Sequence, residues 1–197
     1  MTDVASDRTT VMRARILEAA EELTVADGWS SVTMTRIAQH VGVSRQTVYK
    51  EVGSKPQLAE ALVLDQLLAF LDIVERAFDR HSHDPVAAIR LATRGVLERA
   101  HGHALLRAVV AAPHGSDSDL LPLLTTRSES LLGSSKSVLR IRLKPLTPHL
   151  SDAQLDMSVD VIVRTVLSHV VQPSSAPTRT AASLAWTAER LLVARVR

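Results

Sequence analysis

The chain of 197 residues contains no cysteine, which excludes disulfide bonds and zinc sites built on thiolates. Aromatic residues make up only 3% of the sequence against 46% hydrophobic residues, so the core must consist mainly of Leu, Val, Ala and Ile. No apolar run is long enough to span a membrane, and the polar N-terminus lacks a signal-peptide pattern. These absences are compatible with a reducing compartment, and we expect a cytoplasmic protein that does not contact a membrane.

Sequence motifs of the common enzyme classes are also missing. There is no Gly-x-Ser-x-Gly, no His-Glu-x-x-His and no glycine-rich phosphate loop. Two histidine pairs, His81 with His83 and His101 with His103, have no recognisable carboxylate partner at helical spacing. We therefore expect no enzyme, no cofactor and no bound metal.

Charge of one sign is not in large excess, because 23 basic and 21 acidic residues leave a formal net charge of +2. The local distribution is more informative, since acids gather within residues 18–22 and bases within residues 36–55. A segment with such a dipole can turn its basic side to phosphate without a large total charge.

Helix-forming residues dominate, and no run alternates apolar and polar residues as a half-buried strand does. We predict an all-α protein of about nine helices. Ser54 with Gln57 and Ser151 with Gln154 read as capping boxes at two helix starts, and Gly133 marks a point where a helix is expected to kink or break. Apart from two short helices that begin after Thr33 and after Ser44 and are joined by a turn at residues 41–43, the expected helices cover roughly residues 10–27, 55–81, 85–101, 104–112, 119–143, 152–170 and 178–194.

The most informative segment starts at Thr33 and predicts two short helices joined by a tight turn. Thr33 and Ser44 are suitable N-caps for the first and second helix. Gly42 lies in the turn, where a positive φ is often needed, and Ile37 and Val48 supply the apolar sides that pack together. The pattern favours a helix-turn-helix over the alternative, an ordinary helical corner with a solvated polar side.

The outward side of the second helix carries groups that suit a DNA major groove. Arginine can pair with guanine, glutamine with adenine, and the threonine methyl group contacts thymine. We therefore predict that Arg45, Gln46 and Thr47 read base edges, and that Tyr49 and Lys50 hold the DNA backbone. The full set of predicted DNA-binding residues is Thr33, Arg36, Ser44, Arg45, Gln46, Thr47, Tyr49, Lys50 and Lys55.

This corner and its flanking residues resemble the TetR family of transcriptional regulators. The family pattern reads Arg-x-x-Ile-Leu-x-x-Ala-x-x-Leu, then Gly, then Thr-x-x-x-Ile-Ala-x-x-x-Gly-Val-Ser-x-x-Thr-x-Tyr, then Ser-Lys-x-x-Leu. The match extends over residues 9–60 and is highly specific, because every part occurs in the right order. The matching residues are Arg13, Ile16, Leu17, Ala20, Leu23, Gly28, Thr33, Ile37, Ala38, Gly42, Val43, Ser44, Thr47, Tyr49, Ser54, Lys55 and Leu58.

Two positions depart from the family pattern. Glu51 stands where the family often has His, and Val52 stands where it often has Phe. Val52 can still pack inward, although with less area. Glu51 places a negative charge beside the DNA-facing side, which puts the usual role of this position in doubt.

The resemblance implies an N-terminal three-helix DNA-binding head, residues 1–53, and a larger ligand-binding and dimerisation body, residues 54–197. It also implies a homodimer in which the last two helices of each copy form a four-helix bundle. A dimer suits the head too, because two heads can read a palindrome whereas one half-site discriminates poorly. The expected interface residues are Leu155, Val159, Ile162, Val166, Ala181, Leu184, Ala185, Ala188 and Leu192.

The resemblance further implies a small molecule that enters the body and releases DNA. The scarcity of aromatics argues against a stacking pocket for planar drugs, so an apolar or lipid-like effector, such as a fatty-acyl chain or an alkane, fits the Leu- and Val-rich body better. The expected pocket residues are Leu67, Leu71, Arg94, Val96, His103, Arg107, Val109, Leu124, Val163 and Leu167.

The sequence thus predicts a sequence-specific DNA-binding regulator, a repressor by resemblance, with three partners. These are a palindromic double-stranded operator, a hydrophobic effector and a second copy of the chain. Three alternatives remain. One is a ligand-binding helical bundle with impaired DNA binding, suggested by Glu51 and Val52; one is a metal-responsive regulator, suggested by the histidine pairs; the last is an enzyme on a helical bundle.

Overall fold

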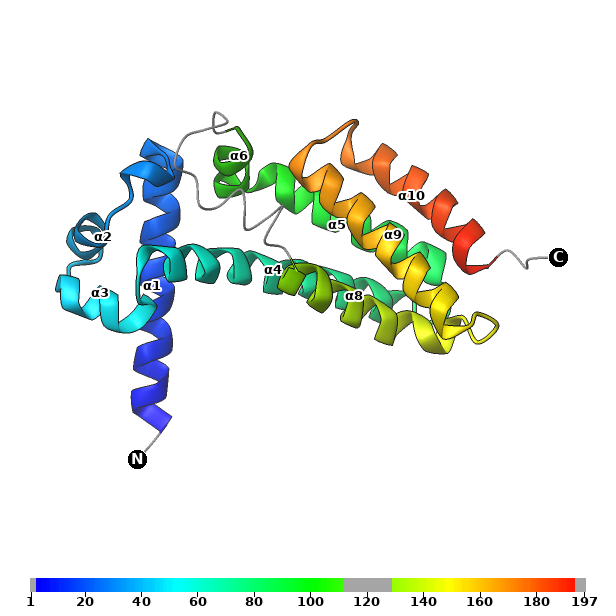
Figure 1. The fold of residues 1–197 in the computed structure, drawn as a ribbon, viewed down its shortest axis with the longest axis horizontal. Coiled ribbons are helices and arrows are strands. Elements are labelled where there is room, and N and C mark those ends of the chain that lie inside the picture. Colours follow the sequence, from blue (N-terminus) through cyan, green and yellow to red (C-terminus); the bar gives the residue numbers. More distant parts are fainter. Residues whose placement is uncertain (1–2, 112–128, 194–197) are drawn as a thin grey trace. The chain divides into compact units, whose positions relative to one another are not determined.

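The computed structural model describes residues 3–111 and 129–193, and within these ranges every regular element is a helix (Figure 1). The all-α prediction is confirmed. The elements are α1 (Asp3–Asp27), the short 3-10 helix η1 (Trp29–Ser31), α2 (Met34–Val41), α3 (Arg45–Val52), α4 (Lys55–Arg80), α5 (Pro85–Gly102), α6 (Ala104–Ala111), α8 (Glu129–Leu143), the 3-10 helix η2 (Lys144–Leu146), α9 (Asp152–Val171) and α10 (Pro177–Leu192).

Some helix bounds differ from the prediction. α1 begins at Asp3 and not near Thr10, so it includes residues that the sequence left without structure. The helix expected over residues 119–143 is seen from Glu129 onward, and its earlier part lies outside the described residues. α8 passes through Gly133 without a break, because one glycine costs a helix only about 1 kcal/mol relative to alanine.

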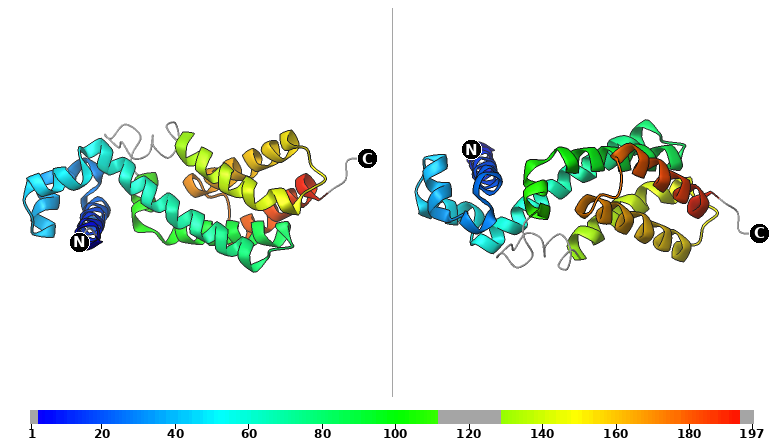
Figure 2. Two further views of the ribbon diagram at one scale, coloured as in Figure 1. Left: turned by 90° about the horizontal axis from the view of Figure 1, so that it is seen from below. Right: turned by 90° about the horizontal axis from the view of Figure 1, so that it is seen from above.

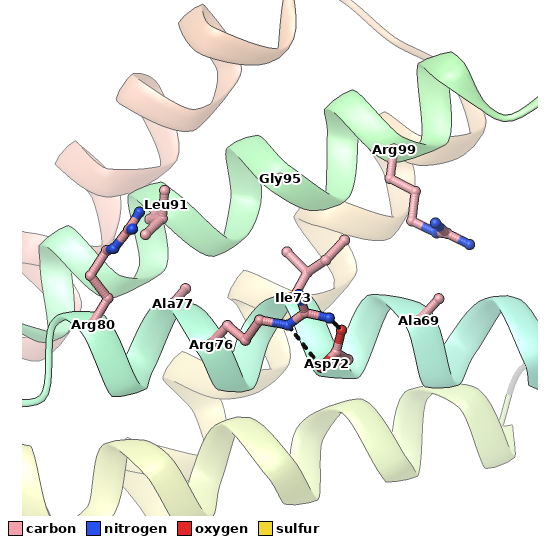
Figure 3. Close-up of a pocket in the computed structure, with 9 residues that line it drawn as sticks. All are labelled: Ala69, Asp72, Ile73, Arg76, Ala77, Arg80, Leu91, Gly95 and Arg99. Atoms are coloured by element: carbon pink, nitrogen blue, oxygen red, sulfur yellow. Dashed lines mark hydrogen bonds and ion pairs between the residues drawn. The ribbon is translucent and has the colours of Figure 1, made fainter.

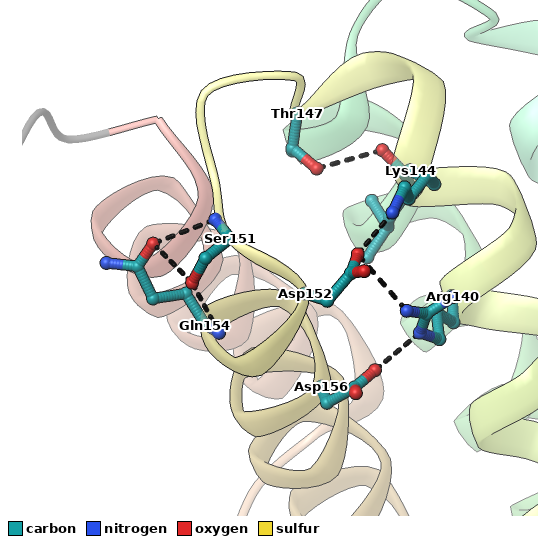
Figure 4. A network of polar contacts seen from close by, with 8 residues as sticks. Arg140, Lys144, Thr147, Ser151, Asp152, Gln154 and Asp156 are labelled. Atoms are coloured by element: carbon teal, nitrogen blue, oxygen red, sulfur yellow. Dashed lines mark hydrogen bonds and ion pairs between the residues drawn. The ribbon is translucent and has the colours of Figure 1, made fainter.

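Side-chain caps fix several helix starts, as the sequence predicted. At the start of α9 the Ser151 amide donates to Gln154 Oε1 at 2.9 Å, and the Gln154 amide donates to Ser151 Oγ at 3.3 Å (Figure 4). Ser54 and Gln57 form the same reciprocal pair at the start of α4. Each pair satisfies backbone N–H groups that the first turn of a helix leaves without partners.

The chain forms two compact units, and each is described by itself. The head unit combines residues up to Gln66 with α6, and the body unit combines Leu67–His103 with α8, η2, α9 and α10. α4 therefore contributes its first turns to the head unit and its remainder to the body unit. The sequence placed this boundary earlier, between residues 53 and 54, before α4 begins.

The body unit is built on an aliphatic core. α5 packs lengthwise on α10, and α8 packs on α9, which Figures 1 and 2 show as neighbouring pairs. Among the described residues of this core, Phe78 is the one aromatic side chain. The buried cluster consists of Phe78, Ala88, Ile89, Leu139, Leu143, Leu155, Val159, Ile162, Leu184, Ala188 and Leu192. Among the described residues, no helix combines the length and apolar character that crossing a membrane requires.

An exposed ionic network joins α8 to α9 (Figure 4). Arg140 Nη2 lies 3.2 Å from Asp152 Oδ1, and Lys144 bonds to the same carboxylate. The bond from Lys144 holds the pKa of the Asp152 carboxyl below its usual value. The bond from Lys136 lowers the pKa of Asp160 in the same way.

Candidate nucleic-acid interface

α2 and α3 of the head unit form the predicted helix-turn-helix. Gly42 ends α2 in the left-handed region at φ 77°, where a side chain would be strained. The amides of Gly42 and Val43 both donate to the carbonyl of Ala38 at 3.0 Å, which closes the turn. Ile37 and Val48 are fully buried, as predicted.

Hydroxyl caps begin both helices of this corner. Thr33 Oγ1 accepts a hydrogen bond from the Arg36 amide at 3.2 Å, and Ser44 Oγ accepts one from the Thr47 amide at 3.0 Å. Both N-cap predictions are confirmed. The Ser44 cap fixes where α3 begins, and this sets which side chains of α3 point outward.

The outer side of α3 is polar and exposed, whereas Val48 and Val52 on the inner side are buried. Arg45, at the start of the helix, donates from Nη2 to Tyr49 Oη at 3.1 Å, and its guanidinium lies 5.3 Å from the centre of the Tyr49 ring. This contact orders a long arginine side chain in the free protein, so less rotamer freedom remains to be lost on binding. The exposed side of α3 is the candidate interface.

Two cations that the sequence assigned to DNA form contacts inside the head unit. Arg36 binds the Asp27 carboxylate and donates to the Ser31 carbonyl at 3.1 Å. Lys55 Nζ donates to the Trp29 carbonyl at 2.9 Å and lies 5.0 Å from the centre of the buried Trp29 ring. These side chains fasten α2 and α4 to the segment around η1, and their contact with DNA stays a prediction.

Sequence reasoning missed two positioning residues on α1. Arg13 donates to the carbonyl of Glu51, near the end of α3, and Arg15 Nη2 donates to the carbonyl of Val41, at the end of α2, at 3.0 Å. A cation at a helix C-terminus donates hydrogen bonds to carbonyls that have no partner within the helix, and it is attracted to the negative end of the helix dipole. Arg13 had a signal, since it begins the family pattern, but Arg15 had none.

The predicted pocket residues do not gather around one described cavity. A cavity of about 700 Å³ within the head unit is lined by α1, α4 and Ala104, and another of about 540 Å³ within the body unit lies between α4 and α5. None of the predicted pocket residues with described side chains lines either one. Leu67 and Val96 are buried; Leu71, His103, Val163 and Leu167 are half-buried; Arg94 and Arg107 are exposed; the Val109 side chain and Leu124 lie outside the described residues.

The predicted dimer residues pack mostly within the protomer. Eight of them are buried, namely Leu155, Val159, Ile162, Ala181, Leu184, Ala185, Ala188 and Leu192, and Val166 lies half-buried against the same core. The widest apolar stripe of α9 and α10 faces the protomer's own interior, and its contact with a second copy stays a prediction. The apolar side chains that these helices expose are Met157, Val161 and Trp186, and the Arg190 guanidinium lies 3.7 Å from the Trp186 ring centre.

Among the described residues, no three His, Asp or Glu side chains gather as they would around a metal ion.

Comparison with known proteins covers both units. Residues 16–62 match the family described as bacterial regulatory proteins of the tetR family, and residues 84–190 match the C-terminal domain of the bacterial tetracycline repressor. The HTH-type transcriptional regulator AlkX of Mycobacterium tuberculosis is 27% identical over 175 residues, which is 89% of this chain and 82% of that protein.

Solved structures show the same architecture. The TetR family repressor AlkX from Dietzia sp. strain DQ12-45-1b, implicated in biodegradation of n-alkanes, superposes with a TM-score of 0.73 at 27% identity and covers 90% of this chain and 96% of its own. FadR of Thermus thermophilus, a repressor solved with lauroyl-CoA, has a TM-score of 0.61 at 20% identity and covers 94% and 97%. With both its head and its body matched, the chain belongs to the TetR family of transcriptional regulators.

Proposed function

We propose that the protein is a repressor that binds a palindromic operator as a homodimer and leaves it when a small apolar or lipid-like effector binds the body unit. The observation that carries the DNA-binding part is the exposed polar side of α3, pinned at its start by Ser44 and by the turn at Gly42. A helix held in this way can enter the major groove with its first residues nearest the bases.

Within this proposal the residues of α3 divide by role. Arg45, Gln46 and Thr47 occupy the first turn and would contact base edges. Tyr49 and Lys50 lie one turn later and would contact phosphates, which position the helix but carry no sequence information. Tyr49 Oη also accepts a hydrogen bond from Arg45. The proposed phosphate contact of Tyr49 and the proposed base contact of Arg45 would therefore be coupled through this bond.

The proposed dimer uses the exposed apolar side chains of α9 and α10. Met157 of α9 and Trp186 of α10 are 60% and 58% exposed in the protomer, so both are accessible to a second copy. Trp is enriched among the residues that dominate interface energies. Two copies joined in this way would present two α3 helices to successive half-sites.

The effector class rests on the aliphatic body and on the relatives. The body core contains one aromatic residue, Phe78, and is otherwise aliphatic. The Dietzia relative is implicated in n-alkane biodegradation, and the Thermus protein was solved with lauroyl-CoA. A long aliphatic molecule is the effector class that these observations support.

The test is fluorescence anisotropy of the purified protein on DNA from upstream of its own coding sequence, with scrambled DNA as the control and a salt series for both. Binding that depends on a palindrome and falls steeply with salt is the expected result, because phosphate contacts release counterions. Equal and weak binding to both DNAs, followed by no enrichment from a random-sequence pool, would contradict the proposal.

A further inference from the structure

A groove of about 700 Å³ lies within the head unit, between α1, the first turns of α4 and the first residue of α6, and its volume is within the range of small-molecule sites. Sequence reasoning assigned none of its lining residues to a site. Four of them are acids, and we refer to it as the acidic groove. The acids are Glu18, Glu21 and Glu22 on α1 and Asp65 on α4.

The acidic groove is elongated along α1. Its lining on this helix extends from Ala14 to Ala26 at spacings of three and four residues, which place the side chains on one side of the helix. This stretch corresponds to about 18 Å of helix. A long, narrow ligand therefore suits the groove better than a compact one.

Apolar side chains supply the rest of the lining. Leu62 of α4 is buried, Leu17 of α1 is half-buried, and Val25 of α1 is 43% exposed. None of the described lining residues is aromatic, so a flat ring would find no stacking partner here. The apolar part of a ligand that fits this lining is an aliphatic chain.

The charge of this lining is opposite to that of the cavity in the body unit. The cavity between α4 and α5 is lined by three arginines and one acid, Asp72 (Figure 3). The described lining of the acidic groove contains four acids and no basic residue. Such a site repels anions, DNA phosphates among them, and attracts cations.

Two of the four acids are exposed and have no ion pair among the described residues. These are Glu18 on α1 and Asp65 on α4. Asp65 Oδ2 lies 3.5 Å from the amide nitrogen of Gln66, which is a weak and uncharged contact. Glu22 differs, because its Oε2 lies 2.8 Å from His40 Nε2. Glu18 and Asp65 thus offer carboxylates from two different helices to a cation in the groove.

We propose that the acidic groove binds an elongated aliphatic amine in its protonated form. The alkyl chain lies along Leu17, Val25 and Leu62, and the ammonium group donates hydrogen bonds to Glu18 or Asp65. A primary ammonium has three N–H donors for carboxylates, whereas a quaternary ammonium has none. This cation site in the head unit goes beyond the proposed function, whose effector is apolar and binds the body unit, and it does not depend on that function.

The test is isothermal titration calorimetry of the full-length protein at neutral pH, below micelle-forming concentrations. The probes share a ten-carbon chain and differ at the end: decylammonium, decyltrimethylammonium and decanol. We expect decylammonium to bind about tenfold more tightly than decanol, because hydrogen bonds to charged groups are strong. It should also bind more tightly than the quaternary cation. Added salt should reduce the advantage over decanol, because exposed charges are screened.

Variants assign the binding to the groove. The double variant Glu18→Gln with Asp65→Asn should lower the affinity for decylammonium to that for decanol and leave the affinity for decanol unchanged. Each single variant should lose part of the advantage. Glu60→Gln is the matched control, because Glu60 is an exposed glutamate on α4 that does not line the groove. Thermal unfolding of each variant checks that the fold is retained.

Three results would overturn the inference. They are equal affinity for decylammonium and decanol, an unchanged affinity for decylammonium in the double variant, and a loss in Glu60→Gln as large as that in the double variant. Equal binding of the primary and the quaternary cation would overturn the hydrogen bonds assigned to Glu18 and Asp65. Anisotropy on operator DNA tests the proposed function separately, and a failure there leaves the cation site in place.

Discussion

The head unit and the body unit both bury aliphatic side chains, but the head unit adds a set of bonds from cations to backbone carbonyls. In the head unit, cations on α1 and α4 bond to backbone carbonyls, as Arg15 does to Val41 and Lys55 does to Trp29. In the body unit, interchangeable aliphatic side chains form the core, and ionic pairs lie on its surface. A carbonyl-bonded cation has one workable geometry, whereas Leu, Ile and Val can exchange with small losses. The head motif could be read directly from its residues, whereas the body is matched only through its family model.

The largest effect is expected from a substitution that creates a cavity in the aliphatic core of the body unit. Leu155→Ala should lower the free energy of unfolding by about 2–5 kcal/mol, because Leu155 is 2% exposed and its loss leaves a void. The measurement is urea denaturation followed by circular dichroism. Ile141→Ala is the control, since Ile141 is 70% exposed and its truncation should change little. Equal losses would mean that Leu155 is not part of a packed core.

The proposed interface makes the next largest prediction. Trp186→Ala should weaken the dimer by about 2–4 kcal/mol, because exposed tryptophans at interfaces are often hot spots. Analytical ultracentrifugation across a concentration series measures the dissociation constant. Ile141→Ala again serves as the control, because it truncates an exposed apolar side chain on another helix, α8. If Trp186→Ala leaves the dissociation constant unchanged while a substitution on another helix abolishes the dimer, the interface does not include α10.

For the head unit, Arg45→Ala should cost about 1–3 kcal/mol of operator affinity and relax specificity at one base pair. Lys50→Ala should instead weaken all sequences alike and reduce the salt slope by about one. Anisotropy with single-base-pair operator variants separates the two effects. If Arg45→Ala loses affinity equally on operator and random DNA, then Arg45 holds phosphate and not a base.

A smaller effect is expected at the C-terminus of α2. Arg15→Ala removes the donor to the Val41 carbonyl and should lower the free energy of unfolding by about 1 kcal/mol, a loss limited because the Arg15 side chain is exposed. Thermal unfolding monitored by circular dichroism measures it. Arg94→Ala is a suitable comparison, since Arg94 pairs only with an exposed glutamate on its own helix. Similar losses in both variants would show that the carbonyl bond adds nothing.

The smallest effect concerns pH. Asp152 and Asp160 have pKa values below the usual 3.8, so their contribution is present above that pH and is lost as the pH falls through their lowered values. Replacing both by Asn should therefore flatten the fall in melting temperature between pH 5 and pH 2. Glu60→Gln, at an exposed position on α4, should leave the fall as it is. If the melting temperature of the double variant falls as much as that of the original protein, the ionic network between α8 and α9 does not contribute to acid unfolding.

The extent of successful prediction follows the same division between units. Thr33, Gly42 and Ser44 could be placed from sequence because caps and positive-φ turns need specific residue types next to their partners. Arg15 could not, because its partner lies 26 residues away and any exposed basic residue looks the same in sequence. On α9 and α10 the pattern located an apolar stripe, but spacing alone does not say whether a stripe meets its own protomer or a second one. Met157 and Trp186 each stand alone among polar surface residues, so they form no apolar stripe that the sequence could reveal.

The scarcity of aromatics has a practical consequence for spectroscopy. The chain has two tryptophans, and the structure places Trp29 in the head unit at 4% exposure and Trp186 in the body unit at 58% exposure. Their emission should differ, with a short-wavelength band from Trp29 and a long-wavelength band from Trp186. A red shift of the first would report opening of the head, and a blue shift of the second would report burial of α10 by another molecule. Each unit thus carries its own optical reporter, without any added label.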